Sequence, residues 1–169
     1  MILIGISGKK RTGKDEVGRI ITELSSKPVY KIAFADALKE EVARACGVTV
    51  QYIEQNKDQF RVILQWWGTD FRRKQDDQYW LKAWAKRGLA LPDDCICIVP
   101  DVRFHNEADY VSWLGGYLFR VHREGLPLDT HKSETDLDKY TFDNIIENNS
   151  SLTSLRESVK QLLTKLQIK

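Results

Sequence analysis

A short cationic loop near the N-terminus has the spacing of a phosphate-binding motif. Gly8 is followed, after four residues, by Gly13 and Lys14, which fits the pattern G-x-x-x-x-G-K. Glycines let the backbone curl until successive N–H groups point into one concavity, and a helix N-terminus behind them favours anions. The motif therefore predicts that a polyphosphate binds along one stretch of the chain: Gly8, Lys9, Lys10, Arg11, Thr12, Gly13, Lys14 and Asp15.

The residue that closes this loop departs from the motif. The position after the lysine ordinarily holds a Ser or Thr whose hydroxyl ligates Mg²⁺, whereas this chain has Asp15. A carboxylate can hold Mg²⁺ directly or through water, so Asp15 is the predicted metal ligand. The alternative is an ordinary glycine-rich turn in which Asp15 is an acid in the first turn of a helix, where the helix dipole favours it.

Further cations follow the predicted strands, as a phosphoryl-transfer site requires. Transfer of a terminal phosphoryl group depends on positioning and on cations around the phosphate oxygens. Arg103 stands at the end of an apolar run, and guanidinium geometry suits a phosphate. Arg123 lies in the polar segment after the next strand. Arg72, Arg73 and Arg120 are additional candidates, with solvated surface charge as the alternative reading.

The elements that must position these residues alternate between apolar runs and helical patterns. We expect strands over residues 2–6, 29–34, 95–99, 117–121 and 142–146. We expect helices over 16–24, 37–46, 49–56, 59–67, 78–87, 106–114 and 151–166, with Gly68-Thr69-Asp70 ending the fourth of these. Polar residues 122–139 should be exposed and mobile.

This alternation predicts the α/β class, with a parallel sheet and helices on both faces. Ligands of such sheets bind at the carboxyl ends of the strands. The glycine loop, the segment after Phe34 and Asp101-Val102-Arg103 should therefore converge on one cleft.

Composition narrows the function classes. A chain of 169 residues with 42% hydrophobic and 30% charged residues suits one globular domain. A net charge of +2 gives no indication of nucleic-acid binding, and no apolar run is long enough to span a membrane. Three cysteines without a secretory signal predict a cytoplasmic protein, with Cys95 and Cys97 as small buried residues and not metal ligands.

Six groups of residues, in order through nearly the whole chain, resemble motifs of the deoxynucleoside monophosphate kinases of tailed bacteriophages. They are Ser7 to Asp15, Leu64-Gln65 with Gly68-Thr69-Asp70, Tyr79-Trp80, Ile98 to Arg103, Asp129-Thr130-His131 and Asn148 to Leu152. The resemblance implies a three-layer α/β/α P-loop kinase fold with a five-stranded parallel sheet, in a single domain 1–169. It further implies a helical acceptor-binding region at about 36–90 and a lid at about 122–139.

The same resemblance implies a reaction. The enzyme would move the γ-phosphoryl group of ATP, with Mg²⁺, to a deoxynucleoside monophosphate in the cytoplasm of the phage's host. Lys14 would hold ATP phosphates, Asp15 would place the metal or acceptor, Arg103 would grip acceptor phosphate, and Arg123 would reach the transferring group from the lid. The acceptor-binding residues would be Gly68, Thr69, Asp70, Trp80, Asp101, Arg103 and His131. The family pattern has Thr where this chain has Glu16, and base preference does not carry over.

Two other functions stay open. Residues 133–138 are similar to a Ser-Glu-x-x-Leu-Asp segment of animal-type phosphomevalonate kinase, so a phosphorylated non-nucleotide acceptor is one alternative. A regulator that binds ATP without chemistry is another, because Asp15 replaces the usual hydroxyl. The partners are expected to be small-molecule nucleotides, without nucleic acid or membrane, and a homodimer is left open. The simplest reading of Trp66, Trp67, Trp84 and Trp113 is core, with Trp66 or Trp67 stacking on a base as the alternative. For Glu134, Asp136 and Asp138 the default reading is solvated charge, with pairing to lid arginines as the alternative.

Overall fold

The computed structural model describes residues 1–127 and 129–168. Leu128, which belongs to the predicted lid, lies outside the described residues. The chain forms two compact units. The first contains Met1–Ile32 and the chain from Leu91 onward, and the second contains Ala33–Ala90.

The first unit is built on a parallel sheet. Within the described residues it has five strands, in the order β2-β3-β1-β4-β5. Their bounds are β1 Ile2–Ser7, β2 Val29–Lys31, β3 Ile96–Val102, β4 Tyr117–His122 and β5 Asn144–Glu147. Ser7, at the end of β1, is in register with Val102 of β3 and Arg120 of β4. The ends of the three central strands therefore lie together, and the predicted parallel sheet is confirmed.

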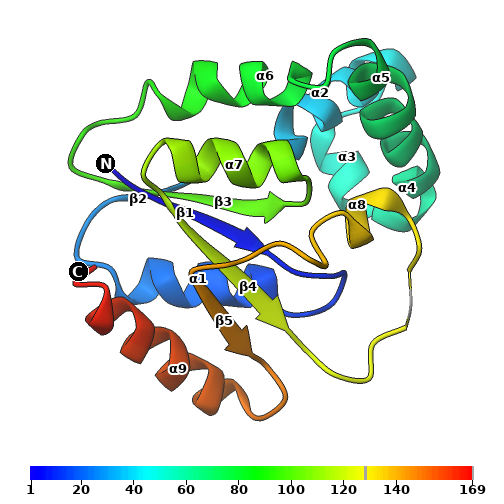
Figure 1. Cartoon of the computed structure of the whole chain (residues 1–169). Coiled ribbons are helices and arrows are strands. Elements are labelled where there is room, and N and C mark those ends of the chain that lie inside the picture. The colour runs from blue at the N-terminus through cyan, green and yellow to red at the C-terminus, as the bar shows by residue number, and fades with distance from the viewer. Residues whose placement is uncertain (128, 169) are drawn as a thin grey trace. The chain divides into compact units, whose positions relative to one another are not determined.

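Helices cover both faces of this sheet, as the alternating pattern predicted (Figure 1). Helices α1 (Lys14–Leu24) and α9 (Leu152–Lys165) lie on one face and share a buried cluster with β1, in which Ile4 and Ile6 meet Ile20, Leu155 and Val159. Helix α7 (His105–Trp113) lies on the other face. It packs close to β1, because a Cβ built on Gly5 would lie 3.2 Å from Val111 Cγ1. The short helix α8 (Lys132–Thr135) lies in the segment between β4 and β5.

The second unit is helical throughout its regular elements. They are α2 (Ala35–Cys46), α3 (Val50–Gln55), α4 (Lys57–Gln65), the π-helix η1 (Trp66–Arg72), α5 (Arg73–Gln75) and α6 (Tyr79–Gly88). Val42, Ala43 and Ile53 form its buried centre, and Leu38 and Trp67 are among the residues packed around it. Glu41 of α2 accepts hydrogen bonds from Trp67 Nε1 and Arg72 Nε, both at 2.9 Å, and from the Tyr79 hydroxyl. One carboxylate thus ties η1 and α6 to α2.

The predicted helix end at Gly68-Thr69-Asp70 is wrong, because the chain continues through these residues as η1. Two contacts explain why Gly68 does not end the helix. A Cβ at Gly68 would lie 2.9 Å from Leu38 Cδ2, so a larger residue would make the Leu38 side chain shift. The Gly68 carbonyl accepts a hydrogen bond from Trp80 Nε1 at 3.0 Å. A carbonyl turned toward a side chain fits the wider winding of a π-helix.

The prediction that the tryptophans form core is only partly confirmed. Trp84 is buried, whereas Trp66 is 51% exposed and Trp113 is 77% exposed. Both exposed rings stack on a neighbour of their own helical segment, Trp66 on Phe71 and Trp113 on Tyr110. Helical spacing alone did not distinguish such surface pairs from core contacts.

The structure also bears on the predictions for the cysteines and for membrane-spanning helices. Cys95 and Cys97 are buried free thiols, as predicted. Among the residues that the structure describes, no helix is long and apolar enough to cross a membrane.

Candidate active site

The glycine loop joins β1 to α1 in a conformation that needs its glycines. Gly8 has φ +150° and Gly13 has φ +99°. A Cβ at Gly8 would lie 2.5 Å from the Val121 carbonyl oxygen, a main-chain atom that cannot move aside cheaply. Arg11 also has a positive φ, of 67°, which is unfavourable for a residue with a side chain. The loop is therefore a specifically shaped turn that leads directly into α1.

Hydrogen bonds hold this loop in shape. Thr12 is buried, and its hydroxyl donates to the Lys9 carbonyl at 2.9 Å. From the turn after β5, Asn148 Nδ2 donates to the Thr12 carbonyl at 2.8 Å. A Cβ at Gly13 would collide with the same asparagine side chain. The loop is thus supported from within and from the β5–α9 turn.

Lys14 is the half-buried cation of the site. Its Nζ donates to the carbonyls of Gly8 at 2.6 Å and Lys9 at 2.8 Å. Burial, followed by the positive charge of Arg103, lowers the pKa of Lys14 to about 8, while Glu134, Asp15 and Asp101 act in the opposite direction. The strand register and the contacts of Glu134 with Lys10 and Arg103 show that the end of β3 lies beside the loop, as the sheet argument predicted. The segment after Phe34 belongs to the second unit, so its predicted convergence on the same cleft stays a prediction.

Arg103 is fixed at both ends. Buried Glu107 accepts its backbone N–H at 2.7 Å and that of Phe104 at 3.1 Å, which fixes the turn from β3 into α7. At the other end, the Arg103 guanidinium pairs with Glu134 and donates to the Ser133 carbonyl at 3.3 Å. These contacts hold the Arg103 backbone and its guanidinium group in one orientation.

Residues 133–138, which we call the acidic strap, carry three carboxylates that each bind another element. Glu134 accepts the backbone N–H of Lys10 at 2.8 Å, in addition to pairing with Arg103. Asp136 accepts the backbone N–H of His105, the first residue of α7, at 3.0 Å. Asp138 pairs with Lys9 Nζ. The strap thus touches the loop and the N-terminus of α7.

The strap is not the exposed segment that its polar sequence predicted. Glu134 is 5% exposed and Leu137 is 2% exposed. Asp138 lies 3.1 Å from Lys9 Nζ and 2.9 Å from Arg120 Nη2. Glu134 is therefore not solvated charge, because it is buried against a cation and a backbone N–H, whereas Asp138 is exposed and pairs with an arginine, the other reading of these acids. Arg120, read as solvated charge or as a site cation, is held by Asp138 and donates to the Ser7 hydroxyl at 3.1 Å.

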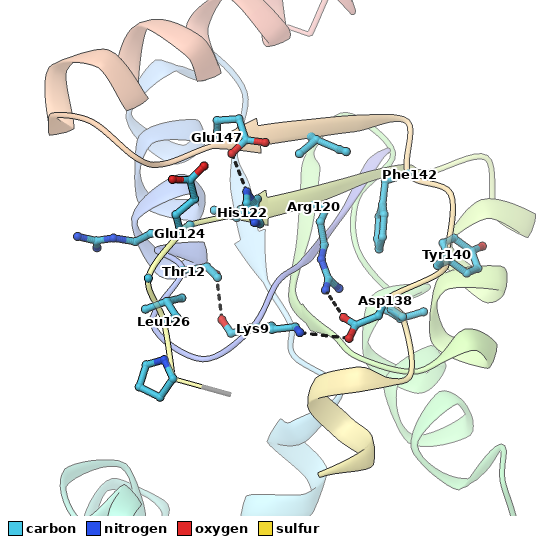
Figure 2. A pocket seen from close by; sticks show the side chains of 16 residues that line it. Lys9, Thr12, Arg120, His122, Glu124, Leu126, Asp138, Tyr140, Phe142 and Glu147 are labelled. Atoms are coloured by element: carbon cyan, nitrogen blue, oxygen red, sulfur yellow. Dashed lines mark hydrogen bonds and ion pairs between the residues drawn. The ribbon is translucent and has the colours of Figure 1, made fainter. Parts of the chain in front are cut away.

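A pocket of about 580 Å³ opens beside the loop (Figure 2). Lys9 and Thr12 of the loop line it, with Arg120, His122 and Glu147 from β4 and β5. Its other lining residues are Val121, Arg123, Glu124, Gly125, Leu126, Pro127, Leu137, Asp138, Tyr140, Phe142 and Ile145. The Arg120 guanidinium lies 5.4 Å from the Phe142 ring centroid, so a cation and an aromatic face share one wall. Figure 2 shows Lys9 and Arg120 meeting at Asp138.

The remaining predicted site residues lie in different surroundings. Asp15 is exposed in the first turn of α1. Arg123 is an exposed residue of the pocket lining. The His131 ring accepts the Ser133 N–H at 3.2 Å and so caps α8. In the second unit, Thr69 is half-buried, and exposed Asp70 lies 3.3 Å from Lys74 Nζ.

The donor set around Lys14 suits Mg²⁺ that arrives with a nucleotide. Within the described part of the chain, no group of three or more His, Cys, Asp or Glu side chains could hold a metal ion. Mg²⁺ commonly takes only one or two protein carboxylates and completes its coordination with phosphates and water. Asp15 and Asp101 both act on the Lys14 ammonium group, so two carboxylates lie in the neighbourhood that such an ion would occupy.

Three residues that shape the site were not among its predicted residues: Glu107, Glu134 and Asn148. Glu107 is the third residue of α7, and an acid at this position is a recognisable helix-start signal. Glu134 and Asn148 belong to the quoted motifs, but a motif gives no direction for a side chain. Only the fold shows that both reach the loop.

The strand order, together with a glycine loop between β1 and α1 and a lysine as the first residue of α1, defines a P-loop phosphotransferase. The family model for deoxynucleotide monophosphate kinase matches residues 48–159, and the chain belongs to this family. A protein of Acanthamoeba polyphaga mimivirus, provisionally named a deoxynucleotide monophosphate kinase, is 29% identical over 178 residues, which cover 90% of this chain and 91% of that protein. The chain is accordingly a kinase, and its phosphate-binding loop lies outside the matched residues.

Solved structures confirm the fold. A gluconokinase from Sinorhizobium meliloti has a TM-score of 0.52 at 16% identity, over 98% of this chain and 95% of that chain. A shikimate kinase from Acinetobacter baumannii has a TM-score of 0.52 at 13% identity, over 99% and 93%. At such identities the likeness establishes the three-layer P-loop kinase fold alone.

Proposed function

We propose that this protein transfers the γ-phosphoryl group of ATP to a deoxynucleoside monophosphate, giving the diphosphate and ADP. The observation that carries the proposal is the cluster of Lys14 and Arg103 beside a glycine loop shaped for phosphate, with Glu134 contacting both the loop and Arg103. Family membership and the mimivirus relative support a nucleotide acceptor. Phosphoryl transfer is catalysed mainly by positioning of the reactants and by electrostatic stabilisation, and the cluster supplies both.

In this proposal each residue of the cluster has a defined task. The loop amides from Gly8 to Asp15 and the Lys14 ammonium group hold the donor phosphates. Arg103 grips the acceptor phosphate, and Arg123 approaches the transferring group from the pocket side. Asp15, with Asp101 nearby, would hold Mg²⁺, which when bound neutralises charge that develops on the phosphate oxygens.

We assign the pocket beside the loop to the base and sugar of the donor. Its volume of about 580 Å³ lies within the range of small-molecule sites. It begins at Lys9 and Thr12, next to the phosphate loop, and offers the Phe142 and Tyr140 rings as apolar surface. A base can stack against such rings while Arg120 stays fixed by Asp138.

The acceptor site is proposed on the resemblance of the motifs. Gly68, Thr69 and Asp70 of the second unit would line the nucleoside, and Asp101 and His131 would complete the acceptor-binding set. Trp80 is 2% exposed, so it would act by holding the Gly68 carbonyl and not through its own surface. His131 would likewise act through α8, which it caps.

An acceptor panel tests the proposal. The protein is mixed with ATP, Mg²⁺ and each deoxynucleoside monophosphate in turn, and ADP release is followed. Turnover with at least one nucleotide is expected, and no turnover with any of them rejects the proposal. Arg103→Ala and Arg123→Ala should each lower kcat/KM by roughly a hundredfold, the scale of losing one transition-state donor. Arg156→Ala, which removes an exposed arginine paired with Glu23, is the matched control.

A phosphorylated non-nucleotide acceptor is the second candidate. The acidic strap, which resembles a segment of animal-type phosphomevalonate kinase, binds the loop and Arg103 directly. ADP release with phosphomevalonate but not with nucleotides would decide for this candidate. ATP binding without turnover on either acceptor would instead support a regulator.

The proposal also covers the protein's setting. Free thiols at Cys46, Cys95 and Cys97 suit the reducing cytoplasm of a host cell, in which a phage enzyme would act on free nucleotides. No nucleic acid is expected as a partner at a net charge of +2. Sedimentation of the purified protein decides between monomer and homodimer.

A further inference from the structure

Glu134 is a buried carboxylate to which the proposed reaction assigns no task. It is 5% exposed, and it is one of the four buried polar or charged residues among the described part of the chain. Its charge acts on Lys14, which is the cation that the proposal places on the donor phosphates. A negative group so close to a phosphate site opposes phosphate binding, so its presence calls for a compensating function.

The two oxygens of Glu134 bind different elements. Oε2 accepts a hydrogen bond from the Lys10 backbone N–H at 2.8 Å, and Oε1 accepts one from Arg103 Nη1. A buried carboxylate is stable only when charged or N–H partners satisfy its oxygens, and here each oxygen has one. The carboxylate therefore fixes the distance between the phosphate loop and the arginine at the end of β3.

The strap fixes the direction of Glu134. His131 caps α8, and Thr135 Oγ1 donates to the His131 carbonyl at 3.4 Å. Leu137 is buried, and Asp136 binds the N-terminus of α7. The Ser133 carbonyl provides a second acceptor for Arg103 Nη1 at 3.3 Å. The side chain is held by these anchors on both sides of it, so it does not depend on Arg103 alone for its orientation.

We propose that Glu134 is a positioning residue, which holds Arg103 and the backbone of the phosphate loop at Lys10 in the arrangement that phosphoryl transfer requires. This inference rests on the proposed function, because it takes Arg103 to act on phosphate. Glu134 touches neither substrate nor metal in this account. Its effect on the reaction passes through Arg103 and the loop.

A double-mutant cycle tests the inference. Glu134→Gln keeps the shape of the side chain but removes its charge, so kcat should fall roughly tenfold to a hundredfold, the coupling range of contacting residues, while the KM for ATP changes less. In an Arg103→Ala background the same substitution should lower kcat clearly less, because only its route through the loop at Lys10 remains. Additive losses in the double mutant, or an unchanged kcat in Glu134→Gln, would overturn the inference.

Asp136→Asn is the matched control. It removes another carboxylate charge from the same strap, but one that binds His105 and not the loop. Its kcat effect should stay additive with Arg103→Ala, and thermal melting should show that every variant is folded. If Glu134→Gln fails to fold, Glu134→Asp replaces it in the cycle, because the shorter carboxylate keeps the charge and cannot reach both partners.

The cycle also separates this inference from the proposed function. If no deoxynucleoside monophosphate is phosphorylated, the proposed function fails, and the same four proteins are compared by their affinity for ATP without acceptor. If the effects of Glu134→Gln and Arg103→Ala on that affinity are not additive, the positioning role of Glu134 is supported. Additive effects on it reject the role.

Discussion

Lys14 shows how burial tunes a single charge. Its ammonium group hydrogen-bonds two loop carbonyls, and burial with Arg103 nearby lowers its pKa to about 8. A bound polyphosphate would favour the protonated form and raise that pKa again. Free and nucleotide-bound protein should therefore differ in the protons they hold above pH 8.

This difference predicts a pH dependence of ATP binding. Below about pH 8 Lys14 is protonated in both states, so affinity is level. Above it, binding must take up a proton, and affinity should fall by up to about tenfold per pH unit. Calorimetric titration between pH 6.5 and 9.5 measures the profile. Lys14→Arg, which keeps its charge throughout, should remove the fall, and a level profile in the unmodified protein contradicts the assignment of Lys14.

Asn148 carries a second prediction at this scale. Asn148→Ala removes the 2.8 Å hydrogen bond to the Thr12 carbonyl, which should cost about 1 kcal/mol of stability and raise the KM for ATP, because the loop loses its outer support. Denaturant unfolding and steady-state kinetics measure the two effects. Asn56→Ala removes a like bond, from Nδ2 to the Tyr52 carbonyl at 2.8 Å, and should leave the KM unchanged. A raised KM in that control would point to general loosening.

Residue types predicted only part of this site. Lys14 and Arg103 follow from motif spacing and strand-end placement, because those signals are local. Glu134 did not follow, since an acid in a polar stretch is ordinarily solvated. Its burial depends on Leu137 entering the core and on α7 offering its N-terminus to Asp136, which are contacts between distant parts of the chain.

Within the elements of the first unit, two glycines differ in the space that is available for an added methyl group. Gly18 lies inside α1, where an added Cβ would meet Lys31, Ile6 and Ile98 at 3.8–4.0 Å, ordinary van der Waals distances. Gly5 lies in β1, where an added Cβ would be 2.8 Å from Leu118 Cδ2 and 3.0 Å from Val102 Cγ2. The same substitution should have opposite effects at the two sites.

Gly18→Ala should stabilise the protein by about 0.5–1 kcal/mol, because alanine favours the helix and limits the unfolded chain. Gly5→Ala should destabilise it by about 1–3 kcal/mol through overpacking between the sheet and α7. Thermal melting measures both, with a shift of about 2–4 °C expected per kcal/mol. A lower melting temperature for Gly18→Ala would show that α1 tolerates less than these distances indicate.

Some helix and strand boundaries differ from the predicted ones, because tertiary contacts override the local sequence signals there. The helix predicted to stop at Gly68 continues, because Leu38 packs against that glycine and Trp80 takes its carbonyl. The second strand ends at Lys31 and not at Phe34. The Asp36 carboxylate accepts the Ala33 N–H at 2.8 Å, so this side chain satisfies the backbone just before α2.

For the whole molecule, the parallel sheet with helices on both faces follows from the alternation of strands and helices. The predicted parallel sheet and three layers are confirmed, because continuous apolar strands buried on both faces leave few other arrangements. The helical region predicted at about 36–90 lies within the unit Ala33–Ala90. Acceptor binding by that region stays a prediction, since composition and spacing do not name a ligand.

The most direct test of the central claim follows the label from [γ-³²P]ATP in a single turnover with a deoxynucleoside monophosphate. The claim is that the Gly8–Asp15 loop and Lys14 hold the phosphates that Arg103 meets. Label should pass to the deoxynucleoside diphosphate with the unmodified protein, stop with Lys14→Ala, and slow strongly with Arg103→Ala. Transfer at a near-normal rate by Lys14→Ala would contradict the claim.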